Sequence, residues 1–274
     1  MKNTLILLLM TLVFTSCTDV FEMEVEKQKD ALVVEGWVTD RAEGNYVRLY
    51  LTVPYFDQPE YTPVSRATVR LTDDAGNSEV LQESQPGRYE IRRMTGVPGR
   101  TYKLVIEAVQ GAYEATATMQ RLSWTLDSVT YEYREKGGMT SEAGFYPHLH
   151  GQELSGGGDF VRLKIFRNGE PLQSASEINL FSDEFVDGNY IRAARPFIRE
   201  PFRQNDRLRY EMWSLTDEAY RFWTDIRTQL NNGGLFAAPG SNTRTNVIKK
   251  DPRAMDVVGY FGASQVRVFE NVIE

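Results

Sequence analysis

The sequence predicts a mainly β protein: an N-terminal immunoglobulin- or transthyretin-like β-sandwich, followed by a second antiparallel β-domain that carries one α-helix. From Ala31 onward, apolar and polar residues alternate with a period of two over many short segments, the pattern of half-buried strands. Residues that favour turns separate these segments at short intervals, as they do in sandwiches. A single stretch, 216–231, has instead the apolar spacing of a helix.

The N-terminal stretch Met1–Cys17 has the layout of a secretory signal peptide. Lys2 gives a basic start, and Leu5–Phe14 is a largely apolar run of ten residues. This run is half of the roughly 20 residues that a membrane-spanning helix needs. Ser16 directly before Cys17 indicates a lipobox, so we expect Cys17 to be lipidated and to become the new N-terminus. A plain secreted protein and an uncleaved anchor are the alternatives.

Residues 18–30 are expected to form an acidic tether, with Asp19, Glu22, Glu24 and Glu26. A solvated linker would explain these acids. They also resemble the signal that exports Bacteroidota lipoproteins to the outer face of the outer membrane. The expected localisation is therefore the outer membrane, lipid-anchored and facing the cell exterior, with the periplasmic face as the alternative.

Composition narrows the function further. The chain has 274 residues, a formal charge of −7 and an isoelectric point near 5.1, which argues against nucleic-acid binding. Cys17 is its only cysteine, so the folded part has no thiol for a disulfide, a thiolate metal site or a cysteine nucleophile. We expect no cofactor. The sequence makes no prediction of oligomeric state.

The N-terminal sandwich is predicted over residues 31–122. Its expected strands are Ala31–Thr39, Val47–Val53, Ala67–Thr72, Ser78–Ser84, Arg88–Arg92, Thr101–Ala108 and Ala112–Met119. Pro54–Pro63 is read as a loop. The run of Asp, Gly and Asn at 73–77 connects two of the strands, because Gly and Asn tolerate the backbone angles of a tight turn.

The second β-domain is predicted over residues 123–274. Its expected strands are Ser128–Arg134, Phe145–His150, Phe160–Arg167, Glu177–Phe181, Asp206–Trp213 and Val257–Phe269, the last one interrupted around Gly262. Lys136–Ser141 and Leu154–Asp159 are read as flexible connections.

The helix predicted over 216–231 has clear start and stop signals. Thr216 can cap its N-terminus, and two acids follow in the first turn, where the helix dipole favours them. The Asn-Asn-Gly-Gly run from Asn231 can end it. Its apolar stripe consists of Ala219, Trp223, Ile226 and Leu230, with Phe222 beside it. We expect this stripe to pack on the second sheet.

The candidate ligand-binding residues lie in one arginine-rich stretch, Ile191–Tyr210, where prolines exclude a helix. Arginine forks beside aromatic rings could bind a carboxylate, a phosphate or a sugar acid. The candidates are Arg192, Arg195, Arg199, Arg203, Phe197 and Phe202. The alternative is that these arginines are surface residues paired with the acidic loop Asp183–Asp187.

No metal or catalytic residues are assigned. His148 and His150 have a spacing that metal sites use, but no third ligand is evident. The acids and Asn residues at 73–77 and 183–189 could hold calcium, but turns need the same residue types there. The sequence has no nucleophile elbow, phosphate-binding loop or dinucleotide fingerprint, so we do not expect an enzyme. A hydrolase would need a pocket in which both histidines and acids converge.

The chain resembles the Bacteroidota lipoprotein family called domain of unknown function 4249. The resemblance covers nearly all of residues 17–273. It rests on LVVEGWVTD (Leu32–Asp40), TDDAGN (Thr72–Asn77), GVPGRTYKL (Gly96–Leu104), NLFSDEFVDGNYI (Asn179–Ile191), SLTDEAYRFW (Ser214–Trp223) and VVGYFGAS (Val257–Ser264). A proline-containing run before the tail, Phe236–Val247, fits the family only loosely.

The resemblance implies an accessory role. Members tend to accompany TonB-dependent outer-membrane receptors, so such a receptor is the expected protein partner, and the lipid on Cys17 would hold the protein in the outer membrane. The family brings no catalytic residues. The expected function is thus a ligand-binding or partner-binding accessory of nutrient uptake. A structural or adhesion lipoprotein of the cell envelope is the alternative.

Overall fold

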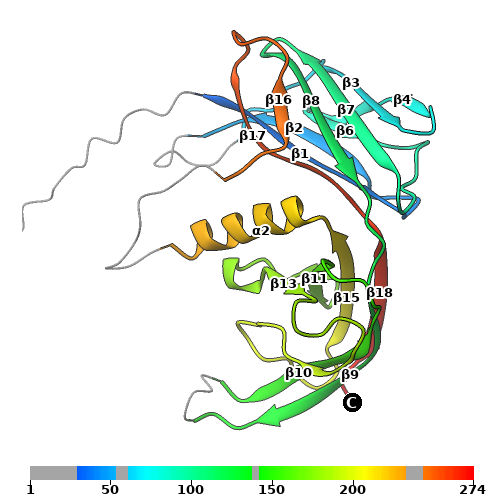
Figure 1. The fold of residues 1–274 in the computed structure, drawn as a ribbon. Helices are drawn as coiled ribbons and strands as arrows, with labels where there is room; N and C mark the ends of the chain where they lie inside the picture. The colour runs from blue at the N-terminus through cyan, green and yellow to red at the C-terminus, as the bar shows by residue number, and fades with distance from the viewer. Residues whose placement is uncertain (1–29, 54–60, 138–141, 233–242) are drawn as a thin grey trace, which may run out of the picture.

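The computed structural model describes residues 30–53, 61–137, 142–232 and 243–274 (Figure 1). Cys17, the signal segment and nearly all of the expected tether lie outside these residues. So do most of the expected 54–63 loop and parts of the 136–141 connection and of the 236–247 run. Among the described residues, no helix has the length and apolar character that crossing a membrane requires.

The fold is mainly β, as predicted, and its first part is a sandwich of two sheets. One sheet has the order β17-β1-β2-β6-β5 and the other the order β16-β8-β7-β3-β4. Their strands are β1 (Ala31–Thr39), β2 (Tyr46–Leu51), β3 (Thr68–Asp73), β4 (Ser78–Val80), β5 (Gln82–Gln85), β6 (Arg88–Glu90), β7 (Thr101–Ala108), β8 (Gly111–Thr118), β16 (Val247–Lys249) and β17 (Asp256–Ser264).

The second unit contains two further sheets and the helix. One sheet has the order β14-β10-β9, and the other has the order β12-β11-β15-β18 with β13 also paired to β11. The elements are β9 (Trp124–Arg134), β10 (Gly144–Glu153), β11 (Phe160–Arg167), β12 (Glu170–Pro171), the 3-10 turn η2 (Ala175–Glu177), β13 (Asn179–Ser182), β14 (Tyr190–Ala194), β15 (Arg207–Leu215), α2 (Asp217–Leu230) and β18 (Val266–Val272).

The sandwich takes two of its strands from the far end of the chain. β17 pairs in parallel with β1, from Ala31 opposite Asp256 to Thr39 opposite Ser264. β16 pairs with β8 at the edge of the other sheet. The predicted assignment of residues 123–274 to the second domain is therefore wrong for residues 247–264, which lie in the sandwich. These residues belong to the sandwich because their apolar side chains, such as Val247 and Phe261, complete its core.

Each unit has its own apolar core. In the sandwich, alternate residues of facing strands are fully buried, among them Leu32 and Val34 of β1 and Leu104 and Ile106 of β7. The second core is built in the same way from β11 and β15, with β9 and β10 covering it. Because successive side chains of a strand point to opposite faces, each strand has one face in the core and one outer face.

Several element boundaries differ from the sequence predictions. Ser78–Ser84 is divided at Leu81, where the chain passes from β4 in one sheet of the sandwich to β5 in the other. The last long strand breaks at Gln265 and not at Gly262, because Gln265 is where the chain passes from the sandwich to the second unit. β14 and β16 were not predicted as strands.

Helix α2 forms nearly as predicted. Thr216 caps it, its hydroxyl accepting the backbone N–H of Ala219. Ala219 and Phe222 are buried, whereas Leu230 at the last turn is 62% exposed, so the apolar stripe ends before it. The helix packs on the second unit, and it also reaches Tyr260 of the sandwich. Figure 1 shows α2 between the sandwich and the second unit.

Candidate ligand-binding cavity between the two units

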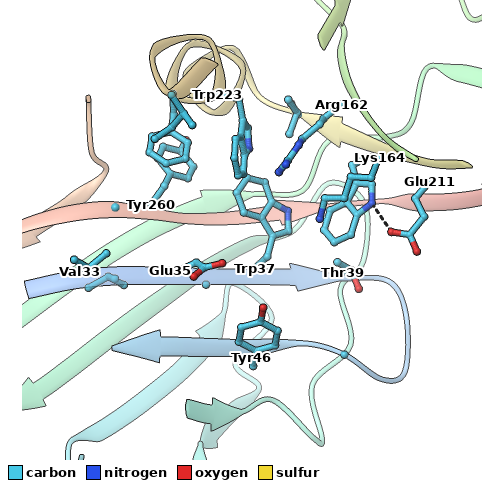
Figure 2. A pocket seen from close by; sticks show the side chains of 18 of the residues that line it. Val33, Glu35, Trp37, Thr39, Tyr46, Arg162, Lys164, Glu211, Trp223 and Tyr260 are labelled. Atoms are coloured by element: carbon cyan, nitrogen blue, oxygen red, sulfur yellow. Dashed lines mark hydrogen bonds between the residues drawn. The ribbon is translucent and has the colours of Figure 1, made fainter. Parts of the chain in front are cut away.

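A cavity of about 760 Å³ lies between the sandwich and the second unit (Figure 2). Its walls come from β1, β2 and β17 on one side and from β11, β15 and α2 on the other. The residues that matter most for its chemistry are Glu35, Trp37, Arg41, Tyr46, Arg162, Lys164, Arg209, Glu211, Trp213, Trp223 and Tyr260. A cavity of this size is in the range that binds small molecules.

Strand periodicity explains why these side chains meet. On β11, Val161, Leu163 and Ile165 enter the second core, so Arg162 and Lys164 must point to the opposite face. β15 alternates in the same way, and β1 sends its apolar residues into the sandwich core. The cavity is therefore enclosed by the outer faces of two sheets, each of which already buries its inner face.

Trp37 is the centre of an aromatic wall. Its ring centroid lies 6.3 Å from that of Trp213, 6.1 Å from that of Trp223 and 6.0 Å from that of Tyr260. Its indole N–H donates to the Ser264 hydroxyl at 2.7 Å, which fixes the ring orientation. The wall joins strands of the sandwich to the strand and helix of the second unit, and it offers flat apolar surfaces to a ligand.

Two cations stand against this wall. The Arg162 guanidinium carbon lies 3.4 Å from the centroid of the Trp223 ring, and Lys164 Nζ lies 3.4 Å from that of Trp213. Neither side chain forms a hydrogen bond or an ion pair with any described residue. Cation–π contacts of this kind compensate part of the cost of removing the charges from water, but they supply no counter-charge.

The lack of a close ion pair is visible in the pKa values of both groups, which the more distant Glu35 raises only in part. Burial lowers the pKa of Arg162 to about 9. Burial, and next the positive charge of Arg162, lower the pKa of Lys164 to about 7. Each shift has the sign expected for a cation in a desolvated place. An anion bound between the two groups would reverse both shifts.

Glu211, in the same cavity, is by contrast fully paired. Its carboxylate accepts from Arg41 Nη1 at 2.8 Å, lies 3.3 Å from Arg209 Nη2 and accepts the Trp213 indole N–H at 3.0 Å. Glu211 is therefore paired first with its own partners. Its charge and that of Glu35 still act on Lys164 from a distance, but they offset only part of the effect of burial on the Lys164 pKa.

Two buried donors in the cavity lack an acceptor. The Nε atom of Arg162 and the indole nitrogen of Trp223 are shielded from solvent and have no hydrogen-bond partner among the described residues. Unsatisfied buried donors are uncommon in folded proteins, and each one calls for an explanation.

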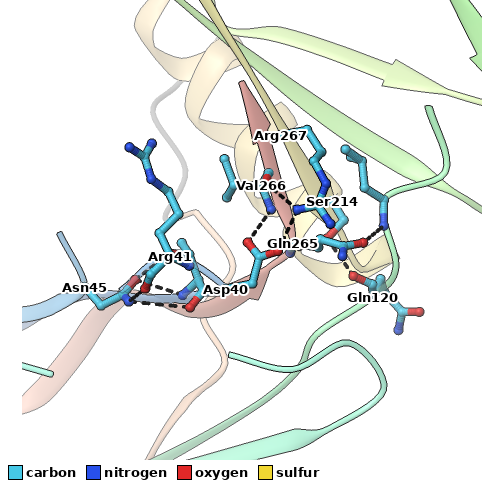
Figure 3. Close-up of polar contacts among 10 residues, drawn as sticks. Asp40, Arg41, Asn45, Gln120, Ser214, Gln265, Val266 and Arg267 are labelled. Atoms are coloured by element: carbon cyan, nitrogen blue, oxygen red, sulfur yellow. Dashed lines mark hydrogen bonds and ion pairs between the residues drawn. The ribbon is translucent and has the colours of Figure 1, made fainter. Parts of the chain in front are cut away.

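The two units are held in register beside the cavity by a polar network (Figure 3). Asp40 accepts the backbone N–H of Val266 and the guanidinium of Arg267, each at 2.8 Å. Gln265 accepts the backbone N–H of Leu122 at 2.8 Å and donates its own backbone N–H to Ser214. The chain crossings at 119–123 and at 265 are thus bound to each other.

The six candidate residues of the arginine-rich stretch do not form this site. None of Arg192, Arg195, Arg199, Arg203, Phe197 and Phe202 lines this cavity or the smaller one described below. Phe202 is fully buried in the second core, where the Arg167 guanidinium covers it, and Phe197 is 55% exposed. Because Phe202 is buried in the core and Phe197 is exposed at the surface, the two rings do not form one binding surface.

The histidines also contact different partners. His148 Nε2 lies 3.4 Å from a carboxylate oxygen of Glu132, and His150 Nε2 lies 2.9 Å from the Thr130 hydroxyl. Burial, and next the charge of Arg195, lower the pKa of His148. Among the described residues, no third potential metal ligand gathers around the pair.

Sequence reasoning missed Arg162 and Lys164 because their alternation looks like that of any half-exposed strand. The run FVRLKIFR predicts one apolar face and one charged face, and a charged face is normally solvated. Only the tertiary arrangement shows that the sandwich covers it. The local signal that could have identified the site is Trp37 and Trp213 on the outer faces of two different strands.

These features define a two-unit β protein with an aromatic, cationic cavity between its units. The chain matches the model of the family described as Domain of unknown function (DUF4249) over residues 18–270, and it belongs to this family. A comparison with curated proteins found no match.

Proposed function

We propose that this protein is a lipid-anchored lipoprotein of the outer membrane that binds an anionic, ring-containing ligand in the cavity between its units. The observation that carries the proposal is the position of Arg162 and Lys164. Both cations are desolvated against tryptophan rings and form no ion pair with a described residue, and the more distant carboxylates Glu35 and Glu211 offset only part of the effect of burial. Folding tolerates such a cost at binding sites more often than elsewhere.

The chemistry of the walls narrows the ligand class. A planar carboxylate accepts hydrogen bonds from a guanidinium and an ammonium group, the two cationic groups that line the cavity. The flat faces of Trp37 and Trp213 suit a ring. We therefore propose a carboxylate attached to a sugar or aromatic ring, small enough for about 760 Å³.

The proposed biological role is that of an accessory to a TonB-dependent receptor. It is supported by the signal-like segment ending in Cys17, by the acidic tether and by the resemblance described above. In this role the anchored protein would capture the ligand at the membrane and pass it to the larger partner.

Ligand binding is tested by calorimetric titration of the purified protein with paired probes. The charged probes are galacturonate and benzoate, and their neutral counterparts are galactose and benzamide. We expect at least one charged probe to bind and its neutral counterpart to bind at least about tenfold more weakly, because a charge-assisted hydrogen bond contributes roughly 1.5–3 kcal/mol.

Matched variants assign the binding to the cavity. Arg162→Gln and Lys164→Met should each weaken it, whereas Lys136→Met, at an exposed lysine outside the cavity, should not. Equal binding of the charged and neutral probes, or unchanged binding by both cavity variants, would contradict the proposal.

The accessory role is tested separately by mild crosslinking in membranes followed by recovery through a tag on this protein. Recovery of a TonB-dependent receptor, reduced by Cys17→Ala, supports the role. Failure to recover any receptor argues against it. A deletion that impairs envelope integrity or attachment without changing uptake favours the structural or adhesion alternative.

A further inference from the structure

A second site lies on the other side of the second unit, where three acids from separate elements meet. Glu153 ends β10, Asp159 directly precedes β11, and Asp183 directly follows β13. One carboxylate oxygen of each lies within 4.8 Å of the others. Glu153 is 2% exposed and Asp183 is 5% exposed, so the charges gather in a place that water barely reaches.

One oxygen of Glu153 points to a missing partner. Its Oε2 accepts the backbone N–H of Gly188 at 2.6 Å, but its Oε1 is buried and has no hydrogen-bond partner among the described residues. Glu153 lines a cavity of about 150 Å³ together with Asp159, Asp183 and Trp124. The indole nitrogen of Trp124 is buried and unpartnered as well.

The local charges are not balanced. Arg121 Nη2 lies 3.1 Å from Asp159 Oδ2, and no other ion pair reaches the three acids within the described part of the chain. One positive charge thus faces three carboxylates. A group with these surroundings is stabilised either by a proton or by a metal cation.

We propose that Glu153, Asp159 and Asp183 bind a calcium ion. Calcium prefers carboxylate oxygens at about 2.3–2.6 Å, so two oxygens bound to one ion lie no more than about 5 Å apart, which the observed spacing allows. Water molecules in the adjoining cavity complete the coordination, and one of them accepts the Trp124 N–H. The ion joins the end of β10 to the loops 154–159 and 183–189.

Asp183 and Asp187 lie in the same acidic loop but have different surroundings. Asp187 does what a turn requires, because its carboxylate accepts the backbone N–H of Gly156 at 2.8 Å. One oxygen of Asp183 accepts the backbone N–H of Asp159 at 3.0 Å, but its carboxylate also faces Glu153 and Asp159. The acidic loop thus contributes Asp183 alone to the site.

The test is thermal unfolding of the full-length protein after treatment with a chelator, with and without calcium chloride. At about 1 mM calcium we expect the melting temperature to rise by about 3 °C, because binding to the native state alone stabilises it. Glu153→Gln and Asp183→Asn should lose this rise. Glu184→Gln, which removes the same charge at an exposed position of the same loop, should keep it.

Three results would overturn the site: no calcium-dependent rise in the wild type, an equal rise in Glu153→Gln, or an equal rise with magnesium chloride. Because Glu153→Gln removes a buried charge, we expect its ion-free form to melt no lower than the ion-free wild type. Should it fail to fold, terbium luminescence of the wild type decides. Emission excited through Trp124 and removed by calcium supports the site, and absence of emission refutes it.

Discussion

At the residue scale, Lys164 combines two opposing effects. Its ammonium group lies over the Trp213 ring between two sheets, and burial there disfavours its charge. The same charge is what would hold an anion. Since the pKa of Lys164 is lowered to about 7, anion binding should weaken as pH rises through neutrality, while Arg162, whose pKa is about 9, remains charged.

Lys164→Met should change the pH dependence of stability. Between the folded pKa of about 7 and the ordinary value of 10.5, the unfolded chain binds a proton that the folded chain does not. Wild-type stability therefore gains with pH across this window, and the variant lacks that gain. We expect the variant to be more stable than the wild type near pH 7, by a margin that shrinks toward pH 10.5.

Urea denaturation over this pH range measures the difference in free energy of unfolding between Lys164→Met and the wild type. Lys136→Met, at an exposed position, should show none. A margin for Lys164→Met that stays constant with pH would show that the ammonium group keeps its ordinary pKa in the fold.

Gly262→Ala should destabilise the aromatic wall. A Cβ at this position would lie 2.4 Å from Trp37 Cζ2, too close for any real contact. Trp37 cannot retreat easily because Trp213, Trp223 and Tyr260 surround it. We expect a loss of about 1–3 kcal/mol in the free energy of unfolding.

Chemical denaturation, together with tryptophan fluorescence, checks this loss. Gly157→Ala is the matched control, since its added Cβ would meet only the Asp187 carboxylate at 3.7 Å. Similar effects of the two substitutions would mean that Trp37 moves aside without cost.

At the element scale, α2 depends on its cap. The Thr216 hydroxyl accepts the Ala219 N–H at 3.2 Å, so Thr216→Ala should cost about 1 kcal/mol. Thr216→Ser keeps the oxygen and should recover most of the loss. Helix content by circular dichroism during urea unfolding distinguishes the two variants. Equal stability of Thr216→Ala and wild type would contradict the role of the cap.

Local pattern predicted most elements well, because strands such as Thr101–Ala108 and Phe160–Arg167 bury one face and alternate cleanly. It failed for β16, which has only three residues and owes its form to pairing with β8. It also could not assign β17 to a partner, because parallel pairing with β1 depends on contacts between distant parts of the chain.

The site was harder to predict than the fold. The arginine-rich stretch after Ile191 was predicted to bind a ligand because its positive charge is concentrated. The density of charge along a sequence does not show which charged side chains are buried in the fold. The two cations that matter, Arg162 and Lys164, are separated by a core leucine and are covered by Trp223, Trp213 and the sandwich, which come from distant parts of the chain. Within each unit the signal is only a tryptophan on the outer face of a strand, Trp37 in the sandwich and Trp213 in the second unit.

At the scale of the whole molecule, the sandwich should not be stable as residues 31–122 alone. Such a fragment lacks β16 and β17, which leaves edges of β1 and β8 unpaired and removes Phe261 from the core. Exposed edge strands promote aggregation. We expect this fragment to elute as aggregates in size-exclusion chromatography.

Adding the segment 246–264 through a flexible linker after residue 122 should restore a soluble monomer with a cooperative melting transition. A fragment 31–122 that is monomeric and melts cooperatively by itself would show that β16 and β17 are dispensable for the sandwich.

The parallel pairing of β1 with β17 also sets the order in which the molecule can fold. Ala31 and Asp256 are partners although more than two hundred residues separate them. Closing so long a loop costs chain entropy before any pairing is gained, and contacts of this kind slow folding. β1 can pair early with β2, but its pairing with β17 must wait until nearly the whole chain has been made, and so must the cavity between the units.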